Sequence, residues 1–346
     1  MKDVARLAGV SQPTVSRVLQ NHPNVREEVR LRVRQAVDTL KYRPNSLVSA
    51  LMADLKTRRP SRVSTTIAFI SAFPTPLGWR NVTDFADYFD GAQERAASQG
   101  YLLDHFWLKE RGMTGPRLSK ILYNRGVPSM LIAPLPSSVG HLSLDWSRFA
   151  SVALGYTLSR PNLTRVTNDH FQTMLLVLRK LRWLGYRKVG IVMEAVSDAR
   201  VSHRWVAAYL AFRMEFSLIT RLDPFLPPAL TEENVVQWFL ANRPDAIVAS
   251  DVRIVPWLKG AGFNIPGDIG YANLSVGPAV TNMAGANQNS RMIGASAVDM
   301  IVGQLHRNER GIPAHPKLTL ISATWEDGPT VRNVRGKKQA GSARGE

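Results

Sequence analysis

Several side chains near the N-terminus could bind DNA. Gln12, Thr14, Ser16 and Arg17 stand close together in the sequence, and each can hydrogen-bond to a phosphate or to a base edge. The guanidinium group of Arg17 can donate two parallel bonds to O6 and N7 of a guanine, which gives about 1–3 kcal/mol of discrimination. Pro13 lacks a side-chain donor and can offer only apolar contact, for example to a thymine methyl group. These residue types indicate contact with double-stranded DNA.

Two short helices can hold these side chains on one face. Helical spacing predicts helices over 2–9 and 12–20, with Gly9 in the tight turn between them. Ser11 is a good N-cap for the second helix, and a proline in the first turn costs little. The apolar side chains expected to join the two helices are Val4, Leu7, Val15, Val18 and Leu19. The pattern therefore predicts a helix-turn-helix, and the alternative is an ordinary helical hairpin.

The same run resembles the N-terminal headpiece of the LacI/GalR (lactose repressor/galactose repressor) family of transcription regulators. The resemblance lies in DVA..AGVS..TVSRVL, over residues 3–19, and it continues more loosely to about residue 331. It implies a three-helix headpiece, a hinge helix, and a two-lobed core similar to periplasmic sugar-binding proteins. In such a headpiece the second helix lies in the major groove. The resemblance also implies a ligand cleft between the two lobes.

The resemblance assigns a role to each DNA-facing residue. Gln12 and Pro13 occupy the positions that choose the base sequence, and Arg17 aligns with the arginine that reads a guanine edge. Thr14 and Ser16 are expected to hold phosphates. For Gln12 the alternative is an exposed polar side chain that caps the helix locally.

A hinge segment is expected after the headpiece. Leu51 aligns with the leucine that the family wedges into the minor groove, where an apolar wedge costs a few kcal/mol of unstacking and is repaid by bent DNA. Asn45 is expected to contact a phosphate or the DNA backbone. The alternative is that Leu51 packs on Leu47 and Leu55 within an amphipathic helix.

Three departures from the family pattern stand in the headpiece. The family has extra residues before the first helix, so we expect the natural start to lie upstream of Met1. Arg26 replaces the small hydroxyl residue that caps the third helix, which we expect over 27–40, and a positive charge there is mildly unfavourable. Gln20 stands where an asparagine is usual.

The charge of the chain favours a polyanionic partner. The 346 residues have a formal net charge of +17. Residues 1–60 have +7, the tail 332–346 has +4, and the 271 residues between them have +6. The excess is therefore concentrated at the two ends of the chain.

The composition excludes several classes of protein. With no cysteine, the chain cannot form disulfides, thiolate nucleophiles or cysteine-ligated zinc sites. No apolar run is long enough for a membrane span, and the N-terminus lacks the apolar region of a signal peptide. We expect a cytoplasmic, nucleoid-associated protein rather than a secreted solute-binding protein, with no cofactor and no metal.

From residue 66 onward, short apolar strands alternate with longer helices. This alternation is typical of parallel sheets covered on both faces, and its length suggests two doubly wound α/β halves. The predicted domains are a headpiece over 1–44, a hinge helix and linker over 45–60, a sensing and dimerisation core over 61–331, and a disordered basic tail over 332–346. The predicted strands are 67–70, 131–133, 151–154, 188–192, 246–249 and 317–323, and the predicted helices are 85–99, 171–184, 205–214, 231–241 and 289–306.

Ligand-binding residues are expected at the carboxyl ends of the strands. Family ligands are mostly sugars, and the residues of this chain that we expect in the cleft are Phe73, Trp79, Asp169, Arg204, Trp205, Asp251, Ser275 and Asn287. The alternative is that both tryptophans belong to the core and that Asp251 caps a helix. Ser275 replaces a family aspartate, and Gly155-Tyr156 replaces an aspartate-arginine pair. The loss of two carboxylates leaves open a different ligand, including an anionic one met by Arg204, or no ligand.

The sequence as a whole predicts a regulator that binds palindromic operators as a homodimer, modulated by a small effector such as a sugar. The enzyme alternative lacks support, because the chain has no phosphate loop, no G-x-S-x-G and no H-E-x-x-H, and its histidines are scattered. A third possibility is a DNA-binding dimer whose core has lost ligand sensing. No heptad tail follows the core, which argues against a tetramer of the zipper type.

Overall fold

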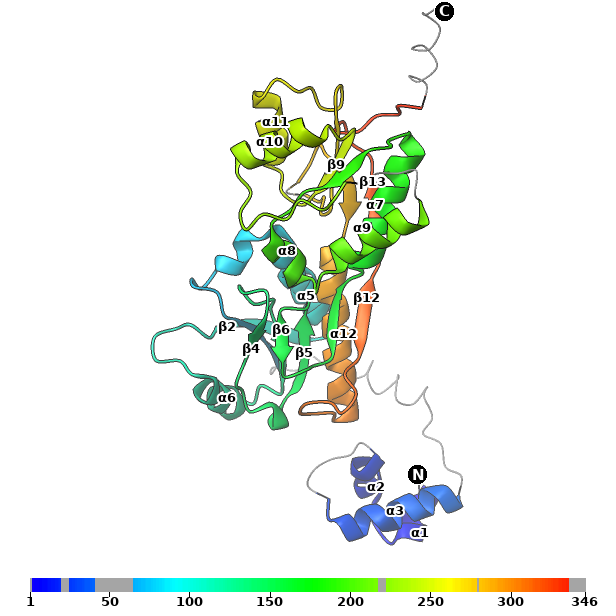
Figure 1. The fold of residues 1–346 in the computed structure, drawn as a ribbon. Helices are drawn as coiled ribbons and strands as arrows, with labels where there is room; N and C mark the ends of the chain where they lie inside the picture. The colour runs from blue at the N-terminus through cyan, green and yellow to red at the C-terminus, as the bar shows by residue number, and fades with distance from the viewer. Residues whose placement is uncertain (1, 20–24, 41–64, 217–221, 279, 336–346) are drawn as a thin grey trace, which may run out of the picture.

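A computed structural model describes residues 2–19, 25–40, 65–216, 222–278 and 280–335 (Figure 1). The segment that contains Asn45 and Leu51 lies outside the described residues, as does the tail from residue 336. In the described part of the chain, no helix is both long enough and apolar enough to cross a membrane.

The headpiece consists of three helices around a small apolar core. They are α1 (Lys2–Ala8), α2 (Gln12–Leu19) and α3 (Glu27–Thr39), close to the predicted bounds. Gly9 has a φ of +63° in the turn between α1 and α2, a conformation that glycine adopts without strain. Val15, Val18 and Val33 are buried at the centre.

Leu7, which was expected in this core, is exposed instead, and so is Leu40 after α3. Leu7 is 55% exposed, because α1 turns Val4, Ala5 and Ala8 inward and leaves Leu7 on the opposite side. Leu40 follows the last turn of α3 and is 43% exposed. The core of the headpiece is therefore smaller than predicted.

The N-lobe of the core is built on a six-stranded parallel sheet. The strand order is β12-β7-β5-β3-β1-β2. The strands are β1 (Thr65–Ser71), β2 (Tyr101–Trp107), β3 (Ser129–Ile132), β5 (Ala150–Leu154), β7 (Arg165–Asn168) and β12 (Leu318–Ile321). Two short strands, β4 (Gly140–His141) and β6 (Leu158–Arg160), form a separate small sheet, and the short helices η1 (Gly78–Asn81) and η2 (Trp146–Arg148) lie in loops.

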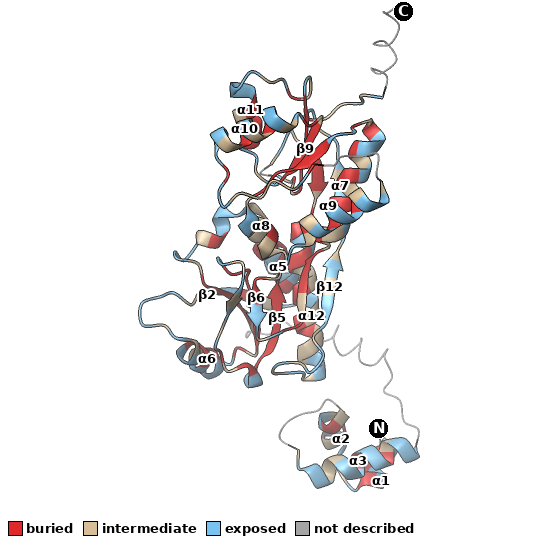
Figure 2. Cartoon of the chain, viewed as in Figure 1, coloured by how far each residue is buried: buried red, intermediate tan, exposed pale blue. Residues whose placement is uncertain are grey.

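Helices cover both faces of this sheet. Ile67 and Phe69 point to α5 (Thr83–Ser98) and α12 (Ser290–Arg307), whereas Ala68 and Ile70 point to α6 (Gly115–Asn124). A strand buried on both sides reads as one continuous apolar run, as 67–70 does. Figure 2 shows the central strand β5 buried, whereas the edge strand β12 is exposed or half-buried.

The C-lobe is a second layered unit. Its sheet has the order β13-β11-β10-β9-β8, and only the pairing of β11 with β13 is antiparallel. Its strands are β8 (Val189–Ile191), β9 (Ala246–Ala249), β10 (Gly270–Asn273), β11 (Ala284–Asn287) and β13 (Thr324–Glu326). Helices α7 (His170–Leu184) and α9 (Arg204–Glu215) pack on one face, and α10 (Glu232–Asn242) and α11 (Ile254–Gly260) on the other. The short α8 (Ala195–Arg200) follows β8.

The chain passes between the lobes three times, before α7, before α12 and before β13. The side chain of Asn168 joins these passes, because its Nδ2 donates to the carbonyl oxygen of Ile321 at 3.0 Å and to that of Gln288 at 3.5 Å. The Nδ2 of Asn289 donates to the carbonyl of Ser322 at 2.9 Å. The three connections thus form one hydrogen-bonded hinge.

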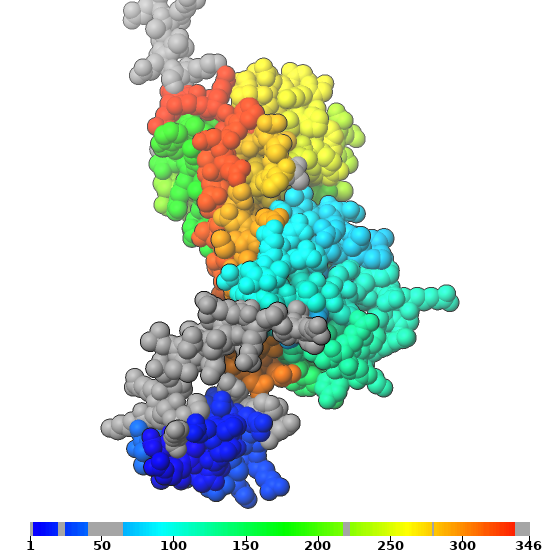
Figure 3. Space-filling model, turned by 180° about the vertical axis from the view of Figure 1, so that it is seen from behind, coloured from blue at the N-terminus to red at the C-terminus, as the bar shows by residue number. Residues whose placement is uncertain are grey.

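Helices α5 and α12 approach each other unusually closely. A Cβ atom at Gly91 would collide with the backbone of Arg291, and one at Gly294 would collide with the backbone of Tyr88. Figure 3 shows these two segments, in cyan and orange, side by side on the face seen from behind. This contact fixes the start of α5 beside the hinge.

The two doubly wound halves are present as predicted, and strand 246–249 has its predicted bounds. The sequence analysis missed β2 and β7, where polar residues such as Asp104 and Asn168 interrupt the apolar pattern. It also missed α6, which begins at Gly115-Pro116 after the N-cap Thr114.

The prediction of a disordered tail from residue 332 is wrong for its first four residues. The backbone N–H of Val334 donates to the carbonyl of Leu184 at 2.8 Å, and that of Arg332 donates to the Tyr186 hydroxyl at 3.0 Å. The guanidinium carbon of Arg335 lies 4.6 Å from the ring centroid of Trp183. These contacts attach the segment to the end of α7, so the ordered core extends to residue 335.

Candidate DNA-binding and ligand-binding sites

Helix α2 presents the predicted DNA-facing residues on its outer side. Val15 and Val18 point into the headpiece, while Gln12, Pro13 and Arg17 are exposed. Thr14 and Ser16 are half-buried at the edges of this exposed surface. The helix therefore offers a polar, cationic face without disturbing its own core.

The start of α2 is held by the predicted cap. The hydroxyl oxygen of Ser11 accepts from the backbone N–H of Thr14 at 3.4 Å, and the two hydroxyl groups lie 2.9 Å apart. Because the Thr14 hydroxyl faces Ser11, a phosphate contact from Thr14 has to share that hydroxyl with the cap. At the start of α3, Arg26 forms no side-chain cap, as its residue type predicts.

The predicted ligand residue Trp79 lies in the core of the N-lobe. It is 1% exposed, with ring centroids of Phe69 and Phe89 at 5.1 Å and 4.9 Å. The guanidinium carbon of Arg80 lies 4.6 Å from its ring centroid. With its ring covered by these neighbours, Trp79 has no free face for a sugar, and the prediction of a stacking residue here is wrong.

Trp205 is also enclosed. It is 5% exposed, it belongs to the core that α7 and α9 share, and the ring centroid of His170 lies 4.8 Å from its own in an edge-on arrangement. The expected stacking on a sugar face is therefore wrong for Trp205 as well.

Three other predicted ligand residues are engaged within the protein. Asp251 forms an ion pair with Arg253, whose Nη2 lies 2.6 Å from Oδ2. Asp169 is the N-cap of α7 and accepts from the backbone N–H of Gln172 at 3.1 Å. Phe73 packs edge-on against Phe85, with 6.2 Å between ring centroids.

Ser275 and Asn287 line a pocket of about 310 Å³ beside the hinge. The Ser275 hydroxyl donates to Oδ1 of Asp84 at 2.7 Å, and Nδ2 of Asn287 donates to Glu326 at 2.5 Å. Asp84 also accepts from the hydroxyl of Ser290 at 2.9 Å. The remaining lining residues are Thr83, Asp87, Val276, Gly277, Pro278, Val280, Asn289, Arg291 and Met292.

Asp84 is a site residue that the sequence analysis missed. It stands on α5 of the N-lobe, whereas Ser275 follows β10 of the C-lobe, so their hydrogen bond joins the lobes. Burial raises the pKa of the Asp84 carboxyl above its usual value, although the bonds from Ser275 and Ser290 oppose that shift. No local motif marks such a residue, because its partners stand about 190 and 206 positions away.

Arg200 forms a second bridge between the lobes. Its guanidinium group extends from α8 and donates to the carbonyl oxygens of Leu135 at 2.9 Å and Pro136 at 2.6 Å. Both carbonyls belong to the loop after β3. The two lobes are therefore closed on each other by side chains of the protein itself.

Arg204, a predicted ligand residue, lies beside other polar groups that have no partner among the described residues. Its guanidinium carbon is 4.5 Å from the ring centroid of Tyr156, which follows β5 in the N-lobe. Within the described residues, Nε of Arg204, the hydroxyl of Tyr156 and Nδ1 of His170 are buried without a hydrogen-bond partner. Tyr156 and His170 were not predicted as site residues, although Tyr156 stands where the resemblance expects a polar pair.

Burial dominates the protonation of these groups. It lowers the pKa of His170 to about 3, with the Arg204 charge adding to the effect, so the imidazole is neutral at physiological pH. Burial raises the pKa of the Tyr156 phenol, which keeps it protonated. No group of three or more histidines, aspartates or glutamates in the described residues could hold a metal ion.

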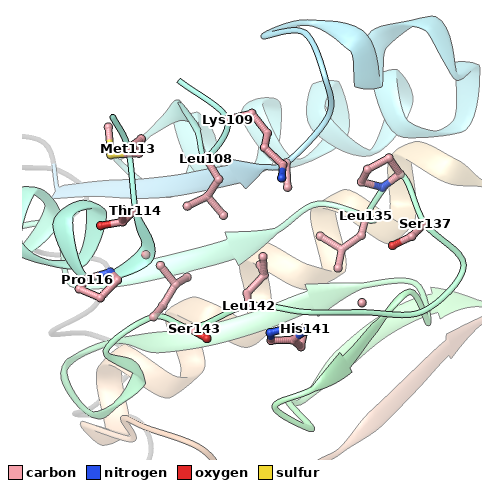
Figure 4. A pocket seen from close by; sticks show the side chains of 15 residues that line it. Leu108, Lys109, Met113, Thr114, Pro116, Leu135, Ser137, His141, Leu142 and Ser143 are labelled. Carbon is pink, nitrogen blue, oxygen red and sulfur yellow. The ribbon is translucent and has the colours of Figure 1, made fainter. Parts of the chain in front are cut away.

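A separate pocket of about 410 Å³ opens at the carboxyl ends of β1, β2 and β3 in the N-lobe (Figure 4). Its walls are mainly apolar, with Leu108, Leu135 and Leu142 directed into it and Lys109 and His141 among its polar residues. None of the predicted ligand residues is among the residues that line it.

Comparison with known proteins gives matches along nearly the whole chain. Residues 1–45 match the family model described as "Bacterial regulatory proteins, lacI family". The chain is 25% identical to the HTH-type transcriptional repressor PurR of Edwardsiella ictaluri, over 96% of this chain and 98% of that protein. It is 24% identical to the catabolite control protein A of Priestia megaterium, over 88% of this chain and 92% of that protein.

The fold matches solved structures of the same kind. The lac repressor dimer bound to operator and the anti-inducer ONPF gives a TM-score of 0.57 at 16% identity, over 95% of this chain and 98% of that one. The transcription regulator CcpA of Lactococcus lactis gives 0.58 at 16% identity, over 78% and 100%. These likenesses confirm the predicted architecture of a helix-turn-helix headpiece followed by a core like that of periplasmic binding proteins.

Proposed function

The chain belongs to the LacI family of bacterial regulatory proteins and is a DNA-binding transcription regulator rather than an enzyme, and from that premise we propose that it represses transcription as a homodimer on palindromic operators. Each headpiece would read one half-site, because a two-fold operator presents two half-sites about one helical turn apart. Such a regulator acts on the chromosome, so the proposal includes a cytoplasmic, nucleoid-associated location.

The observation that supports operator reading most directly is the exposed face of α2. Gln12, Pro13 and Arg17 lie outward while Val15 and Val18 are buried, which is the arrangement that a recognition helix needs. In this proposal Gln12 and Pro13 choose the base sequence and Arg17 reads a guanine.

The remaining DNA contacts belong to the same proposal. Thr14 and Ser16 hold phosphates at the edges of the exposed face. Asn45 contacts the DNA backbone and Leu51 wedges into the minor groove, both outside the described residues.

The core is proposed to sense a small molecule between its lobes. A ligand that favours one arrangement of the lobes would shift the population of DNA-binding dimers, as linkage requires. The unpartnered polar groups of Tyr156, His170 and Arg204 support a ligand at the lobe junction. PurR and the catabolite control protein A, to which the chain is similar, are regulators by name.

A core that only dimerises is the second candidate. It is favoured by the bonds from Arg200 to the loop after β3 and from Ser275 to Asp84, which close the lobes without any ligand. A ligand at 100 times its dissociation constant stabilises its site by about 2.7 kcal/mol, so a thermal-shift screen of small molecules separates the two candidates.

The test of operator binding is selection of bound fragments from random DNA by the full chain. The proposal expects enrichment of a palindrome at moderate ionic strength. Binding that shows no preference for any palindrome over bulk genomic fragments would contradict it.

A further inference from the structure

The lobe junction contains a cluster of aromatic and cationic side chains, which we call the Tyr156 cluster: Tyr156, Arg165, His170 and Arg204. Tyr156 and Arg165 come from the N-lobe, and His170 and Arg204 from the first residues of α7 and α9. The ring centroids of Tyr156 and His170 lie 5.8 Å apart, and the guanidinium carbons of Arg165 and Arg204 lie 5.9 Å and 4.5 Å from the Tyr156 ring. Residues of both lobes therefore meet at one phenol ring.

Three polar atoms of the Tyr156 cluster have no hydrogen-bond partner in the described structure. They are the hydroxyl of Tyr156, Nδ1 of His170 and Nε of Arg204, and each is buried. His170 as a whole is only 6% exposed. Buried polar groups nearly always have partners, and an unpaired group destabilises the fold, so three unpaired atoms at one place need a reason.

The cationic charge of the junction is also uncompensated. Arg165, Arg200 and Arg204 are half-buried there, and none of them pairs with a carboxylate among the described residues. Arg165 and Arg200 donate to backbone carbonyls, which have no net charge. Arg204 contacts Tyr156, with its guanidinium carbon 4.5 Å from the ring centroid. Guanidinium groups stay charged, so the junction has an excess of positive charge.

The nearest carboxylates serve other groups. Asp198, although buried, accepts from Nδ1 of His203 at 2.9 Å and from the backbone N–H of Val206 at 3.1 Å. Asp169 caps α7. Among the ion pairs of the described residues, neither aspartate pairs with Arg204.

The unpartnered groups favour one class of ligand. Arg204 can only donate to a ligand, the protonated phenol of Tyr156 can donate as well as accept, and a neutral imidazole can supply a further donor through Nδ1–H. A sugar hydroxyl needs acceptors as well as donors, whereas a carboxylate or phosphate oxygen only accepts. Charge-assisted bonds from arginine to such oxygens are among the stronger hydrogen bonds in proteins.

We propose that the effector of this regulator is a small organic anion, whose carboxylate or phosphate group lies between Arg204 and Tyr156 at the lobe junction. The inference rests on the proposed function, since it assumes that the core senses a small molecule. Entry of the anion requires the lobes to part, because residues of both lobes cover the Tyr156 cluster.

The test measures the melting temperature and the dissociation constant of the full chain with matched neutral and anionic compounds. The probes are glucose, gluconate and glucose 6-phosphate, with inorganic phosphate and sulfate as minimal anions. Gluconate and glucose 6-phosphate separate a carboxylate ligand from a phosphate ligand. We expect at least one anion to raise the melting temperature, and glucose to leave it unchanged.

Arg204→Gln is the central variant. It removes a half-buried charge that has no ion-pair partner, so the unliganded variant should melt at the same or a higher temperature, while its dissociation constant for the anion rises about tenfold or more. Tyr156→Phe keeps the ring and removes the hydroxyl. It should also weaken binding of the anion, without lowering the melting temperature of the unliganded protein. Arg179→Gln, an exposed arginine on α7 outside the cluster, is the matched control and should bind as the parent does.

Three results would overturn the inference: a lower melting temperature of unliganded Arg204→Gln, equal stabilisation by glucose and the anions, or no stabilisation by any anion of the panel. Operator affinity measured in the same samples separates this inference from the proposed function. If glucose raises the melting temperature and changes operator affinity, the proposed function stands and the proposal of an anionic effector is rejected. An anion that binds through Arg204 without changing operator affinity rejects the sensing function and keeps the anion site.

Discussion

The hydroxyl of Ser275 donates a 2.7 Å hydrogen bond to the carboxylate of Asp84, and this bond joins the C-lobe to the N-lobe. Asp84 is buried, and its second partner, Ser290, begins the helix that leads back from the hinge. The carboxylate of Asp84, in the N-lobe, thus binds both Ser275 of the C-lobe and Ser290, which follows one of the three connections between the lobes. Its protonation should affect how firmly the lobes are closed.

Asp84→Asn should change the pH dependence of stability. Burial raises the pKa of the Asp84 carboxyl in the folded chain above the value of 3.8 that it has when unfolded. The contribution of Asp84 to the free energy of unfolding is therefore fully present below pH 3.8, and it is lost as the pH rises through the folded pKa. Asparagine retains an acceptor for Ser275 and carries no charge at any pH. The variant should therefore lose less stability between pH 4 and pH 7 than the parent, in thermal melts taken across that range.

The exposed Asp104→Asn provides the control, because it also removes one carboxylate but lies on the edge strand β2. If the melting temperatures of the parent and of Asp84→Asn change by the same amount from pH 4 to pH 7, the Asp84 carboxyl does not have a raised pKa in the folded chain.

Arg200→Gln should loosen the closure of the lobes. The change takes away hydrogen bonds to the carbonyls of Leu135 and Pro136, and bonds from charged groups contribute about 1.5–3 kcal/mol each. Amide hydrogen exchange in the loop after β3 should become faster, and small-angle scattering should show a more extended core. Arg111→Gln, at an exposed position, should leave both measurements unchanged.

Arg17→Ala should relax specificity at a single operator position, because only the guanidinium group can pair with O6 and N7 of one guanine. Ser16→Ala should weaken all operators to a similar degree, since a lost phosphate contact carries no sequence information. Binding to a panel of operators with single base changes measures both. Equal loss on every sequence for both variants would contradict the assignment of Arg17 to a base.

The C-terminal segment gives a prediction about stability and one about DNA affinity. A chain that ends at residue 335 should melt like the parent, whereas one that ends at residue 331 should melt at a lower temperature, because it loses the contacts of Arg332, Val334 and Arg335 with the end of α7. Both should show a smaller salt dependence of non-specific DNA binding than the parent, since both lack the basic residues after 335. Identical melting of the two truncated chains would mean that these contacts add no stability.

The three helices of the headpiece could be predicted from the sequence. Helical spacing, Gly9 and the Ser11 cap are local signals, and they fixed the bounds of α2 and the direction of Arg17. Leu7 is the exception, because three neighbouring positions of α1 fill a core too small to include it.

The two-lobed core could be predicted only as a fold. Alternating apolar strands and helices determined the two doubly wound lobes, since burial on both faces of a sheet requires such runs. Which polar residues meet between the lobes depends on contacts between residues far apart in the chain, 65 positions for Arg200 and Leu135 and 191 for Ser275 and Asp84. Trp79 and Trp205 were placed in the cleft by their chemistry, but the packing of each lobe encloses them.

The sequence by itself determined the helices of the headpiece, the doubly wound character of the core, and the surplus of positive charge. Only the tertiary structure decided that Asp84 and Arg200 close the lobes and that Tyr156, His170 and Arg204 come together without partners. The physical reason is that helices, caps and buried strands follow from neighbours in the chain, whereas a junction between lobes is made by side chains whose proximity no local pattern records.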